Sequence, residues 1–153
     1  MTIESVIKNL NEIAPDLIVL KHNKDTATAE EAAKVHNVYI GQIVKTMALI
    51  IDEPILIMMA GDMKLDNKKY KIFFKKKAKM LNSEETLLIT SHPVGGVSPF
   101  GLPNKLRIYA DISLNRYQNV IPAAGSRKSS VVLDRERLIN LLGAEIIDIS
   151  VKK

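Results

Sequence analysis

The chain has 153 residues, of which 46% are hydrophobic and 25% are charged, with a formal net charge of +5 at pH 7 and no cysteine. This length and apolar content predict one globular domain over residues 1–153, and the longest apolar runs are too short to cross a bilayer. The lack of cysteine excludes a disulfide framework and a thiol nucleophile, and without a secretory signal we expect a cytoplasmic protein.

The first third of the chain predicts two helices around a strand. Apolar residues at helical spacing between Ser5 and Ile13 predict a helix, and the apolar run over residues 17–20 predicts a buried strand. Thr28 and Glu31 have the spacing of a capping box, in which a hydroxyl and a carboxylate satisfy free amides at a helix start. A second helix is therefore expected to begin here.

A hairpin and two short helices are predicted for the middle of the chain. The apolar runs Ile43–Ile51 and Ile55–Ala60 are separated by three turn residues, which favours a hairpin. Asp66 is expected to cap a short helix over Lys69–Phe74, and Ser83 to start another.

The last third predicts a helix among strands. The helix is amphipathic, covers Arg135–Leu142 and stops at Gly143, while strands are expected over residues 106–109, 119–121, 131–133 and 146–151. The elements do not follow a strict βαβ rhythm and several connections are hairpin-short. We therefore predict a single α+β domain with a mixed, barrel-like curved β-sheet and flanking helices.

Residues 91–101 form the most informative segment, because it has neither a helical nor a strand pattern and yet differs from a disordered linker. Three glycines permit unusual backbone conformations, two prolines fix φ, and Phe100 needs a packing site. We interpret the segment as one wall of a pocket. A structural crossover loop with Phe100 in the core explains the same residues.

Lys45 is a second candidate, because it lies in an otherwise apolar strand. Alternation places it on one face with Ile43 and Met47, and Thr46 on the other. The lysine either extends from the strand to solvent or projects into a cavity, where its amine would hold a carbonyl, hydroxyl or phosphate.

The turn over residues 122–130 is a third candidate, because its small residues let a ligand approach backbone amides. Gly125 and Ser126 are possible donors to an oxyanion, although a plain hairpin would also explain them. The three histidines are scattered along the chain without a dense acidic cluster, so no metal site is expected. No serine stands in the Gly-x-Ser-x-Gly pattern of a triad nucleophile.

The positive charge is concentrated between Lys64 and Lys79, where eight lysines face one acid, Asp66. Such a segment attracts polyanions through phosphate contacts. An ordinary solvated helix face is the alternative interpretation. Tyr70 and Phe73 lie within the segment and would suit either nucleic-acid contacts or the core.

Six sequence blocks, which together extend over most of the chain, occur in a characteristic order: Thr28–Ala33, Gln42–Thr46, Gly61–Asp66, His92–Gly101, Ala124–Arg127 and Leu141–Ala144. In this order they resemble the YbaK-type aminoacyl-tRNA deacylases, the family that includes the editing domain inserted in bacterial prolyl-tRNA synthetases. The sequence departs from the family at Ser98, where proline is common, and it lacks the histidine that alanine-editing relatives carry in the second turn.

The resemblance implies a free-standing trans-editing enzyme that hydrolyses the ester of a mischarged tRNA, of the tRNA(Pro) type with cysteine, alanine or another small amino acid. It implies no cofactor. The expected partners are an aminoacyl-tRNA and a prolyl-type synthetase, and binding to a membrane or to DNA is not expected. Its expected catalytic residues are Lys45, Gly95, Gly96 and Gly125. Its expected substrate-binding residues are Thr28, Thr46, Pro99, Phe100, Gly101 and Ser126, and its tRNA contacts are Lys64, Lys68, Lys69, Lys75 and Lys76.

Two other functions stay open at this point. A non-catalytic adaptor would retain the pocket and bind tRNA or a synthetase without turnover, and an RNA-binding module would need the lysine segment but not Lys45. The acyl group also stays open among cysteinyl, alanyl, seryl and non-protein amino acids, because one methylene changes binding by only about 1–3 kcal/mol.

Overall fold

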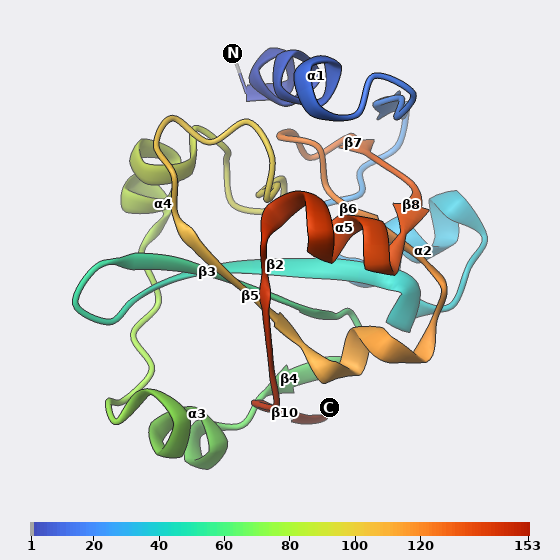
Figure 1. The fold of residues 1–153 in the computed structure, drawn as a ribbon. Helices are drawn as coiled ribbons and strands as arrows, with labels where there is room; N and C mark the ends of the chain where they lie inside the picture. The colour runs from blue at the N-terminus through green and yellow to red at the C-terminus, as the bar shows by residue number, and fades with distance from the viewer. Residues whose placement is uncertain (1) are drawn as a thin grey trace.

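A six-stranded mixed sheet organises the computed structural model, which describes residues 2–153 (Figure 1). Its strand order is β8-β6-β2-β3-β5-β9, in which β2–β3 and β6–β8 are antiparallel and the other neighbours are parallel. The strands are β2 (Ile43–Ile50), β3 (Pro54–Ala60), β5 (Arg107–Asp111), β6 (Asn119–Pro122), β8 (Leu133–Asp134) and β9 (Glu145–Ile147). This arrangement confirms the predicted α+β class with a curved mixed sheet.

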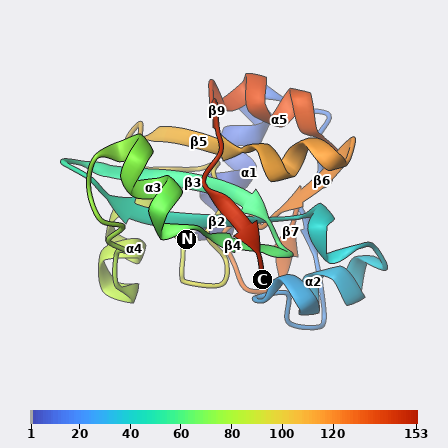
Figure 2. The same cartoon turned by 90° about the horizontal axis from the view of Figure 1, so that it is seen from below.

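Two separate two-stranded ribbons accompany this sheet. In the first, β1 (Leu20–Lys21) pairs with β7 (Ser129–Ser130). In the second, β4 (Met63–Leu65) pairs with β10 (Ser150–Lys152). Figure 2 shows the C-terminus beside α2, where Lys153 Nζ lies 3.5 Å from Glu30 Oε1.

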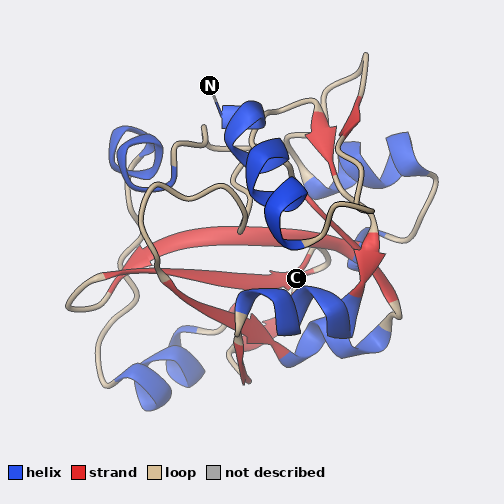
Figure 3. Ribbon diagram, turned by 45° about the horizontal axis from the view of Figure 1, so that its top comes forward, coloured by secondary structure: helices blue, strands red, loops and turns tan. Residues whose placement is uncertain are grey.

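Five α-helices surround these strands within residues 2–153 (Figure 3). They are α1 (Thr2–Ile13), α2 (Ala29–His36), α3 (Asn67–Phe74), α4 (Ser83–Thr90) and α5 (Arg135–Leu142), together with the 3-10 turns η1 (Ile40–Gln42) and η2 (Ile112–Arg116). The predicted capping box of Thr28 and Glu31 and the predicted cap at Asp66 are confirmed. Gly143 ends α5 with a φ of 60°, as its position after Leu142 predicts.

The central hairpin is buried on both faces, which explains why β2 and β3 have no polar face. On one face, Leu56 and Met58 pack with Leu10 of α1 and Leu138 of α5. On the other face, side chains such as Ile57 pack against the helix α3. Figure 1 shows α1 and α3 on opposite sides of the sheet.

Two strand predictions are wrong in part. Residues 17–20 do not form a buried strand: Ile18 is 72% exposed, and only Leu20 and Lys21 find a pairing partner, on β7. Residues 146–151 do not form one strand, because the Ile149 amide donates to the Asp111 carboxylate and the chain divides there into β9 and β10. The strand expected at residues 131–133 is misplaced as well, since β8 covers Leu133–Asp134 and residues 131 and 132 lie outside it.

No helix within residues 2–153 has both the length and the apolar character that crossing a membrane requires.

Candidate active site

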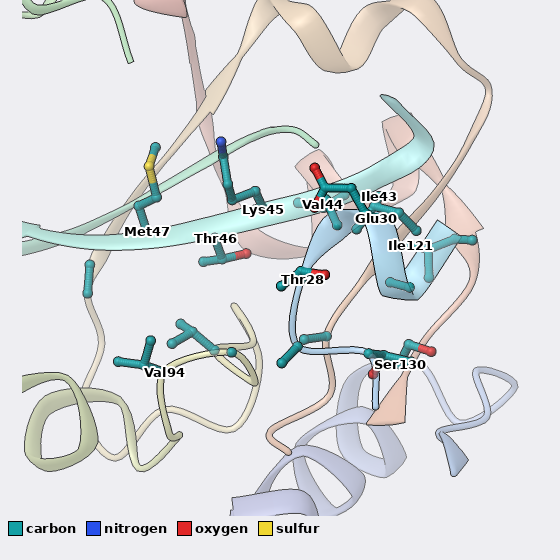
Figure 4. Close-up of a pocket in the computed structure, with 18 of the residues that line it drawn as sticks. Thr28, Glu30, Ile43, Val44, Lys45, Thr46, Met47, Val94, Ile121 and Ser130 are labelled. Atoms are coloured by element: carbon teal, nitrogen blue, oxygen red, sulfur yellow. The ribbon is translucent and has the colours of Figure 1, made fainter. Parts of the chain in front are cut away.

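A cavity of about 430 Å³ lies between β2, the start of α2, the loop after α4 and the turn between β6 and β7 (Figure 4). Its wall is built mainly from small apolar side chains and hydroxyls. They include Thr26, Ala27, Thr28, Ala29, Ala32, Ala48, Val94, Gly95, Val97, Ala123, Ser129 and Ser130. Small residues leave room for a ligand close to the backbone.

The edge of β2 is open where it meets this cavity. The neighbouring strand β6 pairs with β2 only over residues 43–44, and residues 79–81 cover the other end at 48–50. Ala48 directs its C=O to that covering segment, and alternate residues of an antiparallel strand share a direction. Thr46 therefore directs its N–H and C=O into the gap between the two coverings.

The Thr46 side chain adds a polar atom to the same place. Its Oγ1 is buried and has no hydrogen-bond partner among residues 2–153. A buried hydroxyl without a partner loses its hydrogen bonds to water, so this atom is suited to meeting a polar ligand. Sequence alternation placed Thr46 on the correct face but gave no sign of the open edge.

Lys45 lies at the rim of the cavity, on the opposite face of β2 from Thr46 (Figure 4). Its ammonium donates to the Met63 carbonyl of β4 at 2.6 Å, which leaves two further N–H donors. Burial lowers the pKa of Lys45, as does the charge of Lys153, while the Glu30 carboxylate acts in the opposite direction. Among residues 2–153, the hydrogen bond of this half-buried cation thus goes to a neutral carbonyl.

The loop over residues 91–101 combines the two roles that the sequence left open. Val94, Gly95 and Val97 line the cavity, so the loop forms one of its walls. Phe100 is 1% exposed and packs in the core with the helix α1. The buried His92 fixes the loop, because its Nε2 donates to the Phe100 carbonyl at 2.7 Å.

The loop and the second turn are joined through their glycines. The Gly125 amide donates to the Gly96 carbonyl at 3.0 Å, and the Gly96 amide donates to the Pro93 carbonyl at 2.9 Å. Both amides are therefore engaged and do not face a ligand. The Gly95 amide has no partner among the described residues, and its φ of 91° requires glycine.

The structure brings together some of the expected site residues and separates others. Thr28, Lys45, Thr46 and Gly95 line the cavity, while the Ser126 hydroxyl contacts that of Ser129 in its wall, at 2.7 Å. Gly96 and Gly125 join the two loops behind it. Three of the expected substrate-binding residues lie away from the cavity: Phe100 in the core, and Pro99 and Gly101 at a separate depression beside α1.

The lysine segment spans β4, α3 and the chain that follows. Tyr70 is fully buried in the core, whereas Phe73 is 43% exposed. Lys69 pairs with Asp148 at 3.0 Å, and Lys76 pairs with Asp52. The side chains of Lys64, Lys68 and Lys75 have no ion-pair partner among residues 2–153 and are exposed.

Two histidines that looked scattered in the sequence meet in the structure. His22 and His36 both contact the Ser130 hydroxyl, at 2.7 and 2.6 Å. Sequence analysis missed this cluster because its members lie on three separate elements with no recognisable spacing. Within residues 2–153, no group of three or more His, Cys, Asp or Glu side chains is placed to hold a metal ion.

Replacing Gly96 by alanine is expected to separate the two glycine loops. An added Cβ would lie 2.5 Å from the carbonyl carbon of Ser126, so backbone atoms must shift. We expect a loss of about 1–3 kcal/mol in the free energy of unfolding, measured by urea denaturation.

Gly143→Ala is the control for this prediction. Its Cβ would meet nothing within 4 Å, and only the positive φ of 60° opposes it. A loss near 1 kcal/mol or less is expected there. If Gly96→Ala were as stable as the parent chain, the close packing of the two loops would be refuted.

A family model and a bacterial relative each match most of the chain. Residues 23–141 match the family model of the aminoacyl-tRNA editing domain. An uncharacterized protein of Bacillus subtilis, YwhH, is 39% identical over 90% of this chain and 89% of its own length.

A longer relative and a relative of known structure are both connected with prolyl-tRNA synthetase by name. The proline–tRNA ligase of Endomicrobium trichonymphae is 29% identical over 67% of this chain, which corresponds to only 18% of the ligase. The crystal structure of a protein proposed as a trans-editing enzyme for prolyl-tRNA synthetase superposes with a TM-score of 0.90 and 27% identity, covering 99% of this chain and 96% of that protein.

Proposed function

Because the chain belongs to the aminoacyl-tRNA editing domain family, we propose that it hydrolyses the ester of a mischarged tRNA as a free-standing trans-editing enzyme. One observation carries this proposal: a lysine and an open strand edge meet at the rim of a cavity lined by small residues. A cation, backbone donors and a confined space are what recognition of an aminoacyl ester requires.

In the proposed complex, the substrate lies across the open edge of β2. The acyl group enters the cavity on the Thr46 side, among Thr28, Val94 and Ser130 (Figure 4). The terminal ribose and its phosphate lie on the Lys45 side, where the ammonium has two donors left. The ester then sits at the edge itself, between the two faces.

The reaction needs no protein nucleophile, because an aminoacyl ester is already activated. A water molecule attacks the ester carbonyl carbon, and the bond from that carbon to the ribose oxygen breaks. The water proton passes to the leaving ribose oxygen, which gives a free amino acid and a free terminal hydroxyl. The Gly95 and Thr46 amides are the proposed donors to the developing oxyanion, and Lys45 positions the substrate.

The cavity wall supports a small acyl group as substrate. Alanine, threonine, serine and valine side chains surround much of the space, together with larger apolar ones. The larger ones are Ile43, Met47, Met80, Leu81 and Ile121, and the charged side chains among the described residues of the wall are Glu30, Lys45 and Lys153. Together with the similarity to prolyl-tRNA synthetases, this favours tRNA(Pro) carrying cysteine, alanine or another small amino acid. Pockets of this type discriminate by volume and by few polar contacts.

The lysine segment is the proposed landing surface for tRNA. The strand β4 connects it to the site, because Met63 holds Lys45 and the next residue, Lys64, is exposed. Lys68 and Lys75 continue the exposed charge along α3. Lys69 and Lys76 contribute less in the free protein, since each pairs with a carboxylate. Such contacts weaken as the salt concentration rises.

A panel of mischarged tRNAs tests the proposed function. Release of labelled amino acid from each tRNA is measured at low salt, with enzyme-free reactions giving the spontaneous rate. We expect rapid loss of one small acyl group from tRNA(Pro). If no member of the panel were hydrolysed above the spontaneous rate while tRNA or a synthetase still bound, the chain would be a non-catalytic adaptor instead.

A further inference from the structure

Three polar side chains from three elements meet at the cavity wall. Ser130 belongs to β7, His36 is the last residue of α2, and His22 follows β1. The Nε2 atoms of His22 and His36 lie 2.7 and 2.6 Å from the Ser130 hydroxyl oxygen. The two rings meet edge to face, with centroids 4.9 Å apart. One hydroxyl thus serves two imidazoles at once.

The protons available to this cluster restrict its hydrogen bonds. A serine hydroxyl has one proton to donate and two lone pairs, and a neutral imidazole nitrogen either donates or accepts. For both contacts to be hydrogen bonds, one Nε2 must donate to Ser130 and the other must accept from it. The two histidines then have opposite tautomers, and Ser130 keeps one lone pair.

Protonation of the accepting histidine reverses this outcome. Both Nε2 atoms then donate to Ser130, so both of its lone pairs are occupied and its own proton is released. The hydrogen bond that the hydroxyl can still form therefore changes from an accepted one to a donated one. The charge of the histidine pair therefore decides which hydrogen bond Ser130 offers to a third partner.

The third partner comes from the cavity. Ser130 is only 3% exposed but lines the cavity, whereas neither histidine does (Figure 4). Burial lowers the pKa of His22, and burial together with the neighbouring His22 lowers the pKa of His36. At neutral pH both rings are consequently uncharged, and Ser130 has its accepting lone pair.

We propose that Ser130 accepts a hydrogen bond from a donor on the acyl group, and that His22 and His36 are positioning residues that hold its hydroxyl in this accepting state. The identity of the ligand as an acyl group rests on the proposed function. The donor is either the α-amino group or a side-chain hydroxyl, and the experiments below distinguish these two sources.

Among residues 2–153, the charged groups on the elements that carry the cluster make no hydrogen bond or ion pair with its side chains. Lys21 on β1, Lys34 on α2 and Lys128 beside β7 are all exposed. In the loop after His22, Lys24 is exposed, and Asp25 lies 3.8 Å from Arg127. The pKa of each histidine responds to burial and, for His36, to its partner ring.

Binding of stable substrate analogues tests the proposal. The probes are 3′-aminoacylamido-3′-deoxyadenosines, whose amide bond resists hydrolysis, with alanyl, propionyl and seryl groups. The difference in affinity between the alanyl and propionyl analogues measures the contribution of the α-amino group. The difference between the seryl and alanyl analogues measures that of the side-chain hydroxyl. At about pH 7.5 we expect one of these preferences to be about tenfold by calorimetry, and to disappear in Ser130→Ala. The exposed Ser83→Ala is the control.

The dependence on pH distinguishes the two sources. An ammonium only donates, so its preference should fall several-fold once the pH is low enough to protonate the histidines, a pH that nitrogen NMR of the two rings identifies. A hydroxyl also accepts, so its preference should persist. In the double variant His22→Gln/His36→Gln, in which both positions keep a polar group and neither titrates, we expect little change in preference between about pH 7.5 and this lower pH.

Nitrogen NMR of the two imidazoles gives a readout that does not depend on catalysis. At about pH 7.5 one ring is expected to carry its proton on Nδ1 and the other on Nε2. The proposal would be overturned if both rings had the same tautomer. It would also be overturned if Ser130→Ala left both binding preferences unchanged. Failure of the proposed function is a separate result: tRNA esters would stay intact while the analogues still bound with a Ser130-dependent preference.

Discussion

Replacing Lys45 by alanine is expected to lower the rate of deacylation about 100-fold, the equivalent of about 3 kcal/mol in the activation free energy. In the proposed complex the Lys45 ammonium holds the ribose or its phosphate, and a charge-assisted hydrogen bond to a half-buried group is among the stronger polar contacts. The measurement is single-turnover release of amino acid from the mischarged tRNA that the parent chain hydrolyses fastest.

The fold should survive this substitution, which makes the result interpretable. Among residues 2–153 the ammonium donates one hydrogen bond, to the Met63 carbonyl, and its stem lies at the rim of the cavity rather than in the core. Lys105→Ala is the matched control, because it removes an equal charge from an exposed position that lies outside both the cavity and the lysine segment. Turnover in Lys45→Ala at the parent rate would refute the role of Lys45, whatever the behaviour of the control.

Local signals in the sequence were sufficient for much of the fold. The capping box at Thr28, the cap at Asp66 and the stop at Gly143 are interactions between residues within a few positions of one another. The apolar runs of the central hairpin also predict their own pairing. The strand predicted over residues 17–20 was wrong because apolar composition does not show whether a partner strand is present.

The candidate site was less predictable, because its chemistry depends on contacts between distant segments. Alternation placed Lys45 and Thr46 on opposite faces, but only the short pairing with β6 shows that the edge between them is open. The Gly96 and Gly125 amides looked available as donors, yet the bond between the two loops engages them. The histidine pair is another such contact, since Ser130 lies 108 positions from His22.

Asp111→Ala should be the most destabilising substitution considered for this chain, at about 3–5 kcal/mol in the free energy of unfolding. The Asp111 carboxylate is 1% exposed and accepts three hydrogen bonds. The donors are the Ile149 amide at 2.8 Å, the Ser150 hydroxyl at 2.6 Å and the Ser113 amide at 2.9 Å. Alanine would leave these buried donors without their acceptor, and urea unfolding measures the loss.

The same substitution should reach the candidate site through the C-terminal strand. Asp111 fixes the start of β10, and β10 pairs with β4, where Lys152 lies opposite Met63, the residue whose carbonyl holds Lys45. Amide hydrogen exchange in β4 and β10 should therefore accelerate more than exchange in β2. Asp148→Ala is the control from the same segment, because it removes only an exposed pair with Lys69 and should cost about 1 kcal/mol or less. Equal losses in the two variants would mean that the buried carboxylate does not hold β10 against β4, and that Lys45 depends on its own strand alone.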